Sequence, residues 1–169
     1  MSIDNIQLPV SLYPSLFKNN LVDLQTKMNR HQSHKQDPEV DFLGGNEKHI
    51  AFIINNEHHT YLNDNELKFL SGLINACNIT MADISIVNFA RNKNIRYNIL
   101  SSSLASRKIL CFGVSSSDID LPFAIPYFQV QTFQEIQYIF CPHLEQLQED
   151  IDSKKQLWVS LRKIFNLNK

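Results

Sequence analysis

The side chains best suited to chemistry in this sequence come shortly after its first strongly apolar run. Glu57, His58 and His59 follow residues 49–54, and the carboxyl end of a strand is where open α/β sheets usually hold their ligands. Neutral imidazole suits both a general acid or base and a metal ligand. Adjacent residues of an extended segment point apart, however, and no HxxxH, HxH or CxxC spacing supplies converging ligands. We therefore expect these side chains on an exposed loop and predict no metal site.

The other candidate catalytic groups lack the settings that would activate them. Cys111 and Cys141 lie in or beside apolar strand runs, where a thiol is usually a small buried hydrophobe with a raised pKa. The serine runs at 101–103 and 115–117 lack the GxSxG turn that exposes a nucleophile. His143 lies beside Pro142 at the predicted start of a helix, so we expect it to cap that helix or to be exposed to solvent. We predict no catalytic residues.

Glycine is scarce, and this excludes two common kinds of nucleotide enzyme. The chain has only four glycines, at positions 44, 45, 72 and 113. They cannot form a GxGxxG turn or a GxxxxGK[ST] phosphate cradle, both of which need the backbone to approach the ligand closely. We therefore expect no nucleotide cofactor bound by these motifs. We also predict no other cofactor.

Charge is segregated along the chain, although the 16 Lys and Arg nearly balance the 17 Asp and Glu. Residues 84–117 hold five basic residues and no acidic one, and residues 118–152 hold seven acidic residues and no basic one. Arg91, Lys93 and Arg96 follow the second predicted strand, so they are candidates for contact with a phosphate backbone or an acidic partner. The alternative is that they are solvated charges that partly pair with the acidic block on folding. Without a basic excess, direct nucleic-acid binding is expected to be weak or absent.

In residues 49–169, short apolar runs alternate with segments whose apolar residues recur at helical spacing. Strands are predicted at 49–54, 83–90 and 108–114, followed by 127–133 and 137–140 as a fourth strand and its continuation or a short fifth. Helices are predicted at 63–77, where Asn63 and Glu66 form a capping box, around 97–105, at 142–147 and at 157–165. This alternation predicts a three-layer α/β/α sandwich with a mostly parallel sheet of four to five strands.

In the first 48 residues, apolar side chains concentrate in one short stretch and the remainder is polar. One helical stripe is formed by Tyr13, Leu16, Phe17, Leu21 and Leu24. Residues 25–48 are polar and aperiodic, and they contain Pro38 and the Gly44-Gly45 pair, which are typical of linkers. We predict an amphipathic segment plus polar linker over residues 1–48 and an α/β domain over residues 49–169. The amphipathic segment either packs on the domain as core or serves as a partner-binding peptide.

Length and composition favour a cytoplasmic protein of one domain with a small appendage. The 169 residues fit one domain. The three cysteines form no CxxC pair, which indicates a reducing compartment. The apolar runs are too short for a membrane helix, and the N-terminus lacks the basic-then-apolar pattern of a signal peptide. We therefore expect no membrane partner.

Motifs in the carboxyl-terminal half carry a family resemblance. They are, in order, Leu110-Cys111-Phe112-Gly113, Pro122, Gln129-Val130, Pro142-x-Leu144-x-x-Leu147 and Lys155-x-Leu157-Trp158-x-x-Leu161. This order resembles the psi subunit of the bacterial DNA polymerase III holoenzyme, in which a strand runs into a Pro-x-Leu-x-x-Leu turn and then a basic, Leu-Trp helix. The resemblance covers roughly residues 49–165 and is most specific over residues 142–161.

The resemblance implies a uracil-DNA glycosylase-like fold and a non-enzymatic adaptor function. Psi-like subunits join the clamp loader to the chi subunit and, through it, to single-stranded-DNA-binding protein. They reach the clamp loader through an N-terminal peptide with an aromatic residue, so Tyr13, Leu16 and Phe17 are the matching partner-binding candidates. A chi-like subunit would dock on the folded domain.

Two alternatives stay open. Active nucleobase glycosylases of the same fold carry a Gly-rich motif with Asp or Asn after the first strand and a late His-Pro-Ser-type motif. In this chain, residues 54–58 and 141–144 stand at the places of these two motifs. Asn55 or Asn56 would position a water, but the chain lacks the glycines that let the backbone fit closely around an extruded base. The second alternative is an orphan domain that has the same fold but is neither an adaptor nor a glycosylase.

Overall fold

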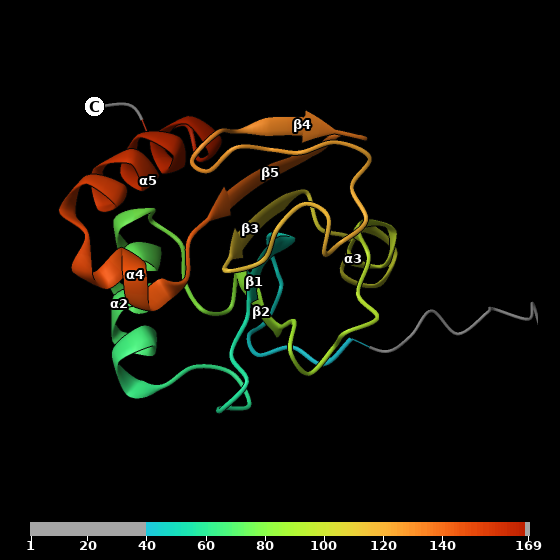
Figure 1. Cartoon of the computed structure of the whole chain (residues 1–169), viewed down its shortest axis with the longest axis horizontal. Coiled ribbons are helices and arrows are strands. Elements are labelled where there is room, and N and C mark those ends of the chain that lie inside the picture. The colour runs from blue at the N-terminus through green and yellow to red at the C-terminus, as the bar shows by residue number, and fades with distance from the viewer. Residues whose placement is uncertain (1–39, 168–169) are drawn as a thin grey trace, which may run out of the picture. The chain divides into compact units, whose positions relative to one another are not determined.

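A five-stranded sheet organises residues 40–167, the part of the chain that the computed structural model describes (Figure 1). Its strands are β1 (Ile50–Ile54), β2 (Ile84–Asn88), β3 (Lys108–Phe112), β4 (Gln131–Phe133) and β5 (Ile136–Cys141). The order across the sheet is β2-β1-β3-β5-β4. Neighbours pair in parallel except β4, which is antiparallel to β5. The predicted α/β architecture with a mostly parallel sheet is confirmed.

Helices cover both faces of this sheet, which makes it the middle of three layers (Figure 1). The helices are α2 (Asp64–Ala76), α3 (Tyr97–Leu104), α4 (Leu144–Glu149) and α5 (Ile151–Ile164). Side chains alternate between the two faces of a strand. In β1, Phe52 therefore packs in the cluster with α2, α4 and α5, and Ile53 packs in the cluster with α3. Every residue of β1 and β2 is buried, as expected for parallel strands covered on both faces.

Several element boundaries differ from those the sequence predicts. β1 begins one residue late because His49 has a left-handed φ of 55°. The expected strand over 127–133 shortens to β4, which turns into β5 through Gln134 and Glu135, both with positive φ. Positive φ at two successive residues suits a tight hairpin. α5 begins six residues earlier than predicted, because the Asp150 side chain accepts hydrogen bonds from the first turn.

Residues 40–48, assigned to the linker from sequence, pack on the α/β domain. Val40 is buried in the core cluster that contains α3. Leu43 bridges Ile86 of the edge strand β2, exchanging both backbone hydrogen bonds at 2.9 and 2.8 Å. The backbone of residues 45–48 then donates to carbonyls of residues 81–84. The domain therefore includes residues 40–48.

The Gly44-Gly45 pair allows this close backbone approach. Gly44 has a φ of +115°, and a Cβ there would lie 2.3 Å from the carbonyl oxygen of Ile84. A Cβ on Gly45 would lie 2.5 Å from the carbonyl oxygen of Ala82. These glycines therefore serve close packing, whereas the sequence alone indicated a flexible linker.

Gly44→Ala and Gly72→Ala should change stability in opposite directions. At Gly44 the new Cβ meets backbone at a positive φ, so we expect a loss of more than about 1 kcal/mol. Gly72 lies inside α2 with nothing within 4 Å of the Cβ position, so alanine should raise stability by about 0.5–1 kcal/mol. Urea unfolding of both variants measures these effects. An unchanged Gly44→Ala midpoint would show that residues 40–48 add nothing to the domain.

Asp83 makes the attachment of this segment sensitive to pH. Its carboxylate accepts hydrogen bonds from Lys48 Nζ at 3.0 Å and from the Thr80 backbone N–H at 2.8 Å, and these bonds lower the pKa of Asp83. A lowered pKa stabilises the fold above the unfolded value of about 3.9, and this stability is lost as pH falls through the folded pKa.

Urea unfolding of the wild type and Asp83→Asn at pH 7 and at pH 3 tests this linkage. The stability difference should be largest at pH 7 and should shrink on acidification, because the wild type then protonates Asp83. Lys48→Met should show part of the same effect. A difference that stays constant across this range would contradict the linkage.

Candidate functional site

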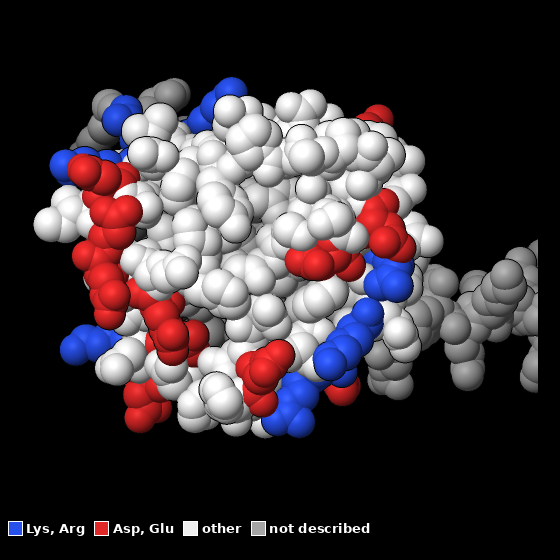
Figure 2. Space-filling model, viewed as in Figure 1, with Lys and Arg blue, Asp and Glu red and all other residues white. Residues whose placement is uncertain are grey.

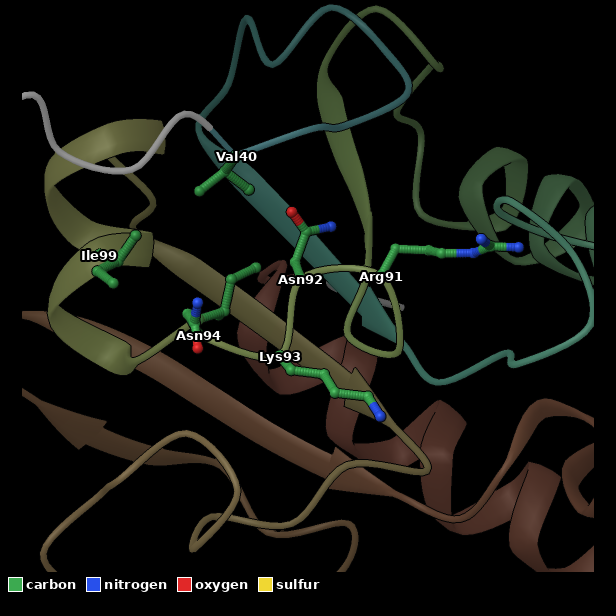
Figure 3. A pocket seen from close by; sticks show the side chains of 7 residues that line it. Val40, Arg91, Asn92, Lys93, Asn94 and Ile99 are labelled. Atoms are coloured by element: carbon green, nitrogen blue, oxygen red, sulfur yellow. The ribbon is translucent and has the colours of Figure 1, made fainter.

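The carboxyl ends of β1, β2, β3 and β5 lie at one edge of the sheet, where the predicted candidate residues gather. Two hollows open there. One, of about 330 Å³, is polar and is lined by Asn55, Asn56, Glu57, His58, Glu66, His143 and Glu145. The other, of about 170 Å³, is lined by Val40, Arg91, Asn92, Lys93, Asn94, Ile95 and Ile99 (Figure 3).

Arg91 and Lys93 line the second hollow, but they do not converge on one point. Both are exposed, and their side chains extend away from Val40 and Ile99 in separate directions (Figure 3). A phosphate site needs donors that converge on one anion. The loop therefore presents two separate cations to solvent.

Arg96 is engaged elsewhere. Its Nε forms an ion pair with Asp120, and its Nη1 donates to the carbonyls of Ile95 at 3.1 Å and Lys93 at 3.3 Å. Asp120 belongs to the acidic block of the sequence. One pairing between the basic and acidic blocks is thus present, as the alternative interpretation of these charges expected.

The loop after β1 is held by asparagine side chains. Asn56 Oδ1 accepts the backbone N–H groups of His58 and His59 at 3.0 Å each, and its Nδ2 donates to Glu66 Oε2 at 2.9 Å. Glu66 also accepts from the Asn63 backbone N–H at 2.9 Å, which confirms the predicted capping box of α2. Asn56 is therefore occupied in organising the loop, and His58 and His59 are exposed, as predicted.

Asn88, which the sequence analysis missed, is the centre of this arrangement. It is fully buried at the end of β2. Its Nδ2 donates to the carbonyls of Asn56, His59 and Thr60 at 2.7, 3.0 and 3.0 Å. Its Oδ1 accepts the N–H groups of Asn56 and Ala90 at 3.1 Å. A lone amide at the carboxyl end of the buried run 84–88 is the signal that could have identified it.

His143 faces Gly113 across the same edge. Gly113 follows β3 with a φ of +68°, and a Cβ there would lie 2.3 Å from His143 Nδ1. The glycine of the 110–113 motif is thus required both by the left-handed turn and by the imidazole beside it. Asn55 Nδ2 donates to the Gly113 carbonyl at 3.4 Å, which links the loops after β1 and β3.

The three cysteines are buried thiols. Burial raises the pKa of Cys77 to about 11 and raises the pKa values of Cys111 and Cys141 further above their usual range. A thiol that stays protonated is a poor nucleophile. The predicted structural role of Cys111 and Cys141 is confirmed.

Surface charges are only partly segregated. On the face shown in Figure 2, acidic side chains form a band along one side, over α4 and the start of α5, with basic side chains near its ends, and basic and acidic side chains lie together on the opposite side. Within residues 40–167, no group of three or more His, Cys, Asp or Glu side chains could hold a metal ion. In the same range, no helix is long and apolar enough to cross a membrane.

The remaining predicted site residues, Tyr13, Leu16 and Phe17, lie outside the described residues. Comparison of the sequence with models of known protein families gave no match, and comparison with curated proteins gave none either. The function therefore has to be argued from the residues and their geometry.

Replacing Asn88 should loosen the carboxyl edge. Asn88→Leu keeps the volume but leaves buried loop carbonyls and N–H groups without partners, so we expect a loss of about 2–4 kcal/mol. Hydrogen exchange should quicken first at residues 56–60, and urea unfolding measures the total loss.

Asn98→Leu is the matched control, because Asn98 is exposed on α3. It should leave both measurements nearly unchanged. Equal exchange at residues 56–60 in the wild type and Asn88→Leu would contradict the role of Asn88 as the centre of the loop.

Proposed function

We propose that this chain is a non-enzymatic, cytoplasmic adaptor subunit of the DNA replication machinery with a uracil-DNA glycosylase-like fold. It links the clamp loader to single-stranded-DNA-binding components through protein–protein contacts, including a chi-like subunit. Tyr13, Leu16 and Phe17 contact the clamp loader, and the folded domain contacts the chi-like subunit.

The observation that carries this proposal is the fit between the psi-like motifs and the packing of α4 and α5. Leu144 and Leu147 of the Pro-x-Leu-x-x-Leu motif are buried with Leu157 and Leu161 of the Leu-Trp motif in one core cluster. The motifs are thus one packed unit, whose leucines face the sheet. Trp158 of the same motif stays 39% exposed, as suits a contact residue.

The geometry of the carboxyl edge favours an adaptor over the glycosylase alternative. A residue that positions a catalytic water needs a free polar atom aimed at the substrate. Both polar atoms of the Asn56 side chain are already bonded within the protein. Asn55 lines the polar hollow, but the loop lacks the glycine-rich backbone that base extrusion requires.

Purification of the tagged full-length chain from the cells that naturally make it tests the proposal. We expect clamp-loader subunits and single-stranded-DNA-binding protein to co-purify. Replacing Tyr13, Leu16 and Phe17 together with alanine should deplete the clamp loader at least about tenfold, because aromatic and apolar anchors dominate such contacts.

The matched control replaces Asn19, Asn20 and Gln25 with alanine and should leave recovery unchanged. Reproducible absence of replication proteins would refute the adaptor function. Release of bases from uracil-containing DNA, lost in Asn55→Ala, would establish the glycosylase alternative instead.

A further inference from the structure

An apolar groove of about 340 Å³ lies between α2 and α5 and shares no lining residue with the two hollows at the carboxyl edge. Its apolar and glycine lining consists of Phe69, Gly72, Leu73, Leu157, Trp158 and Leu161. Leu157 and Leu161 are buried, whereas Phe69 and Leu73 are only partly buried and Trp158 is 39% exposed. An open apolar groove between two helices is the kind of surface that receives an amphipathic helix.

Gly72 keeps this groove open. It lies inside the 13-residue helix α2, where glycine costs about 0.5–1 kcal/mol relative to alanine. Nothing in the described chain requires it, because no atom lies within 4 Å of the Cβ position and its φ is not left-handed. The missing side chain instead exposes helix backbone, over which the backbone of an occupant can approach closely.

The charges on the rim specify the kind of occupant. Lys68 of α2 and Lys154 of α5 line the groove, and no acidic residue does. The Lys154 ammonium donates to the Gln148 carbonyl at 2.7 Å, which fixes its position. Lys68 has no ion-pair partner within residues 40–167. Carboxylates on an occupant would complement both lysines.

We propose that the groove binds one amphipathic helix of a partner protein, with apolar side chains at i, i+4 and i+7 between α2 and α5. Acidic side chains flank this stripe and face Lys68 and Lys154. The proposal rests on the adaptor function proposed above and assigns the contact that the folded domain makes, separate from the contact of Tyr13, Leu16 and Phe17.

Trp158 allows a direct measurement, because it is the only tryptophan in the chain. The probe is a Trp-free synthetic helical peptide with three leucines at this spacing and glutamates on both flanks. Added to the full-length protein, it should give a saturable blue shift of the emission. A matched peptide with lysines in place of the glutamates should bind at least about tenfold more weakly.

Gly72→Glu places a carboxylate in the groove at a position with room for a side chain. It should weaken binding of the acidic peptide at least about tenfold, with a thermal midpoint no lower than that of the wild type showing that the variant is folded. Asn75→Glu adds the same charge to α2 outside the groove lining. This control should keep wild-type binding.

Five outcomes would overturn the proposal. Three concern the peptides: no emission shift with the acidic peptide up to about 1 mM, equal binding of the two peptides, or undiminished binding of the acidic peptide by Gly72→Glu. The fourth is Trp158 emission that changes on dilution of the protein alone, which would assign the groove to a second copy of the chain. The fifth is a Trp158 side chain that iodide cannot quench at any dilution, which would assign the groove to the chain itself.

Failure of this proposal can be told apart from failure of the adaptor function. If the acidic peptide binds but the native purification recovers no replication proteins, the groove assignment stands and the adaptor function falls. If the chi-like subunit and single-stranded-DNA-binding protein co-purify equally with wild type and Gly72→Glu, the adaptor function is supported and the groove assignment is wrong.

Discussion

Both faces of the parallel sheet must be covered, and most of the structure follows from how residues 40–167 meet that requirement. β1 and β2 are buried throughout, so any uncovered side would expose a continuous apolar strip. Three helices cover one face, and α3 is the one helix of the described range on the other. The loop after β3 completes that second face with Ile119, Leu121 and Ile125. A loop that sequence shows only as serine-rich is therefore part of the core.

The elements that could be predicted from sequence are those whose signals are local. The apolar runs around β1, β2 and β3 and the period of α2 reflect contacts that each segment makes with its own face of the core. The Asn63–Glu66 capping box spans three residues and is closed within one helix turn. Such patterns do not depend on what lies across the fold.

The features that could not be predicted depend on neighbours distant in the sequence. Gly44 and Gly45 have the composition of a linker, and only the carbonyls of residues 82 and 84 show that they pack closely. The hairpin turn at Gln134-Glu135 lacks the usual Asn-Gly signal, so the sequence left open whether residues 137–140 continue the fourth strand or form a short fifth. Asn88 falls inside the strand predicted over residues 83–90, and its role appears only when the loop at 56–60 folds over it.

Apolar residues at helical spacing occur both in the core and on contact surfaces. The sequence alone therefore cannot say which apolar residues of the candidate site are buried and which are open to a partner. Leu157 and Trp158 are neighbours in one motif, yet the first is buried and the second is 39% exposed. The apolar residues of the predicted helix over 63–77 recur on one face, at Leu67, Leu70, Leu73, Ile74 and Cys77. Leu67 is nevertheless 40% exposed, whereas Phe69, outside that stripe, lines the groove. Helical period locates a face only to within about one residue position, or 100°. Which side chains at the margin of a stripe remain open depends on how α2 and α5 pack together on the sheet, and the period of one helix carries no information about that packing.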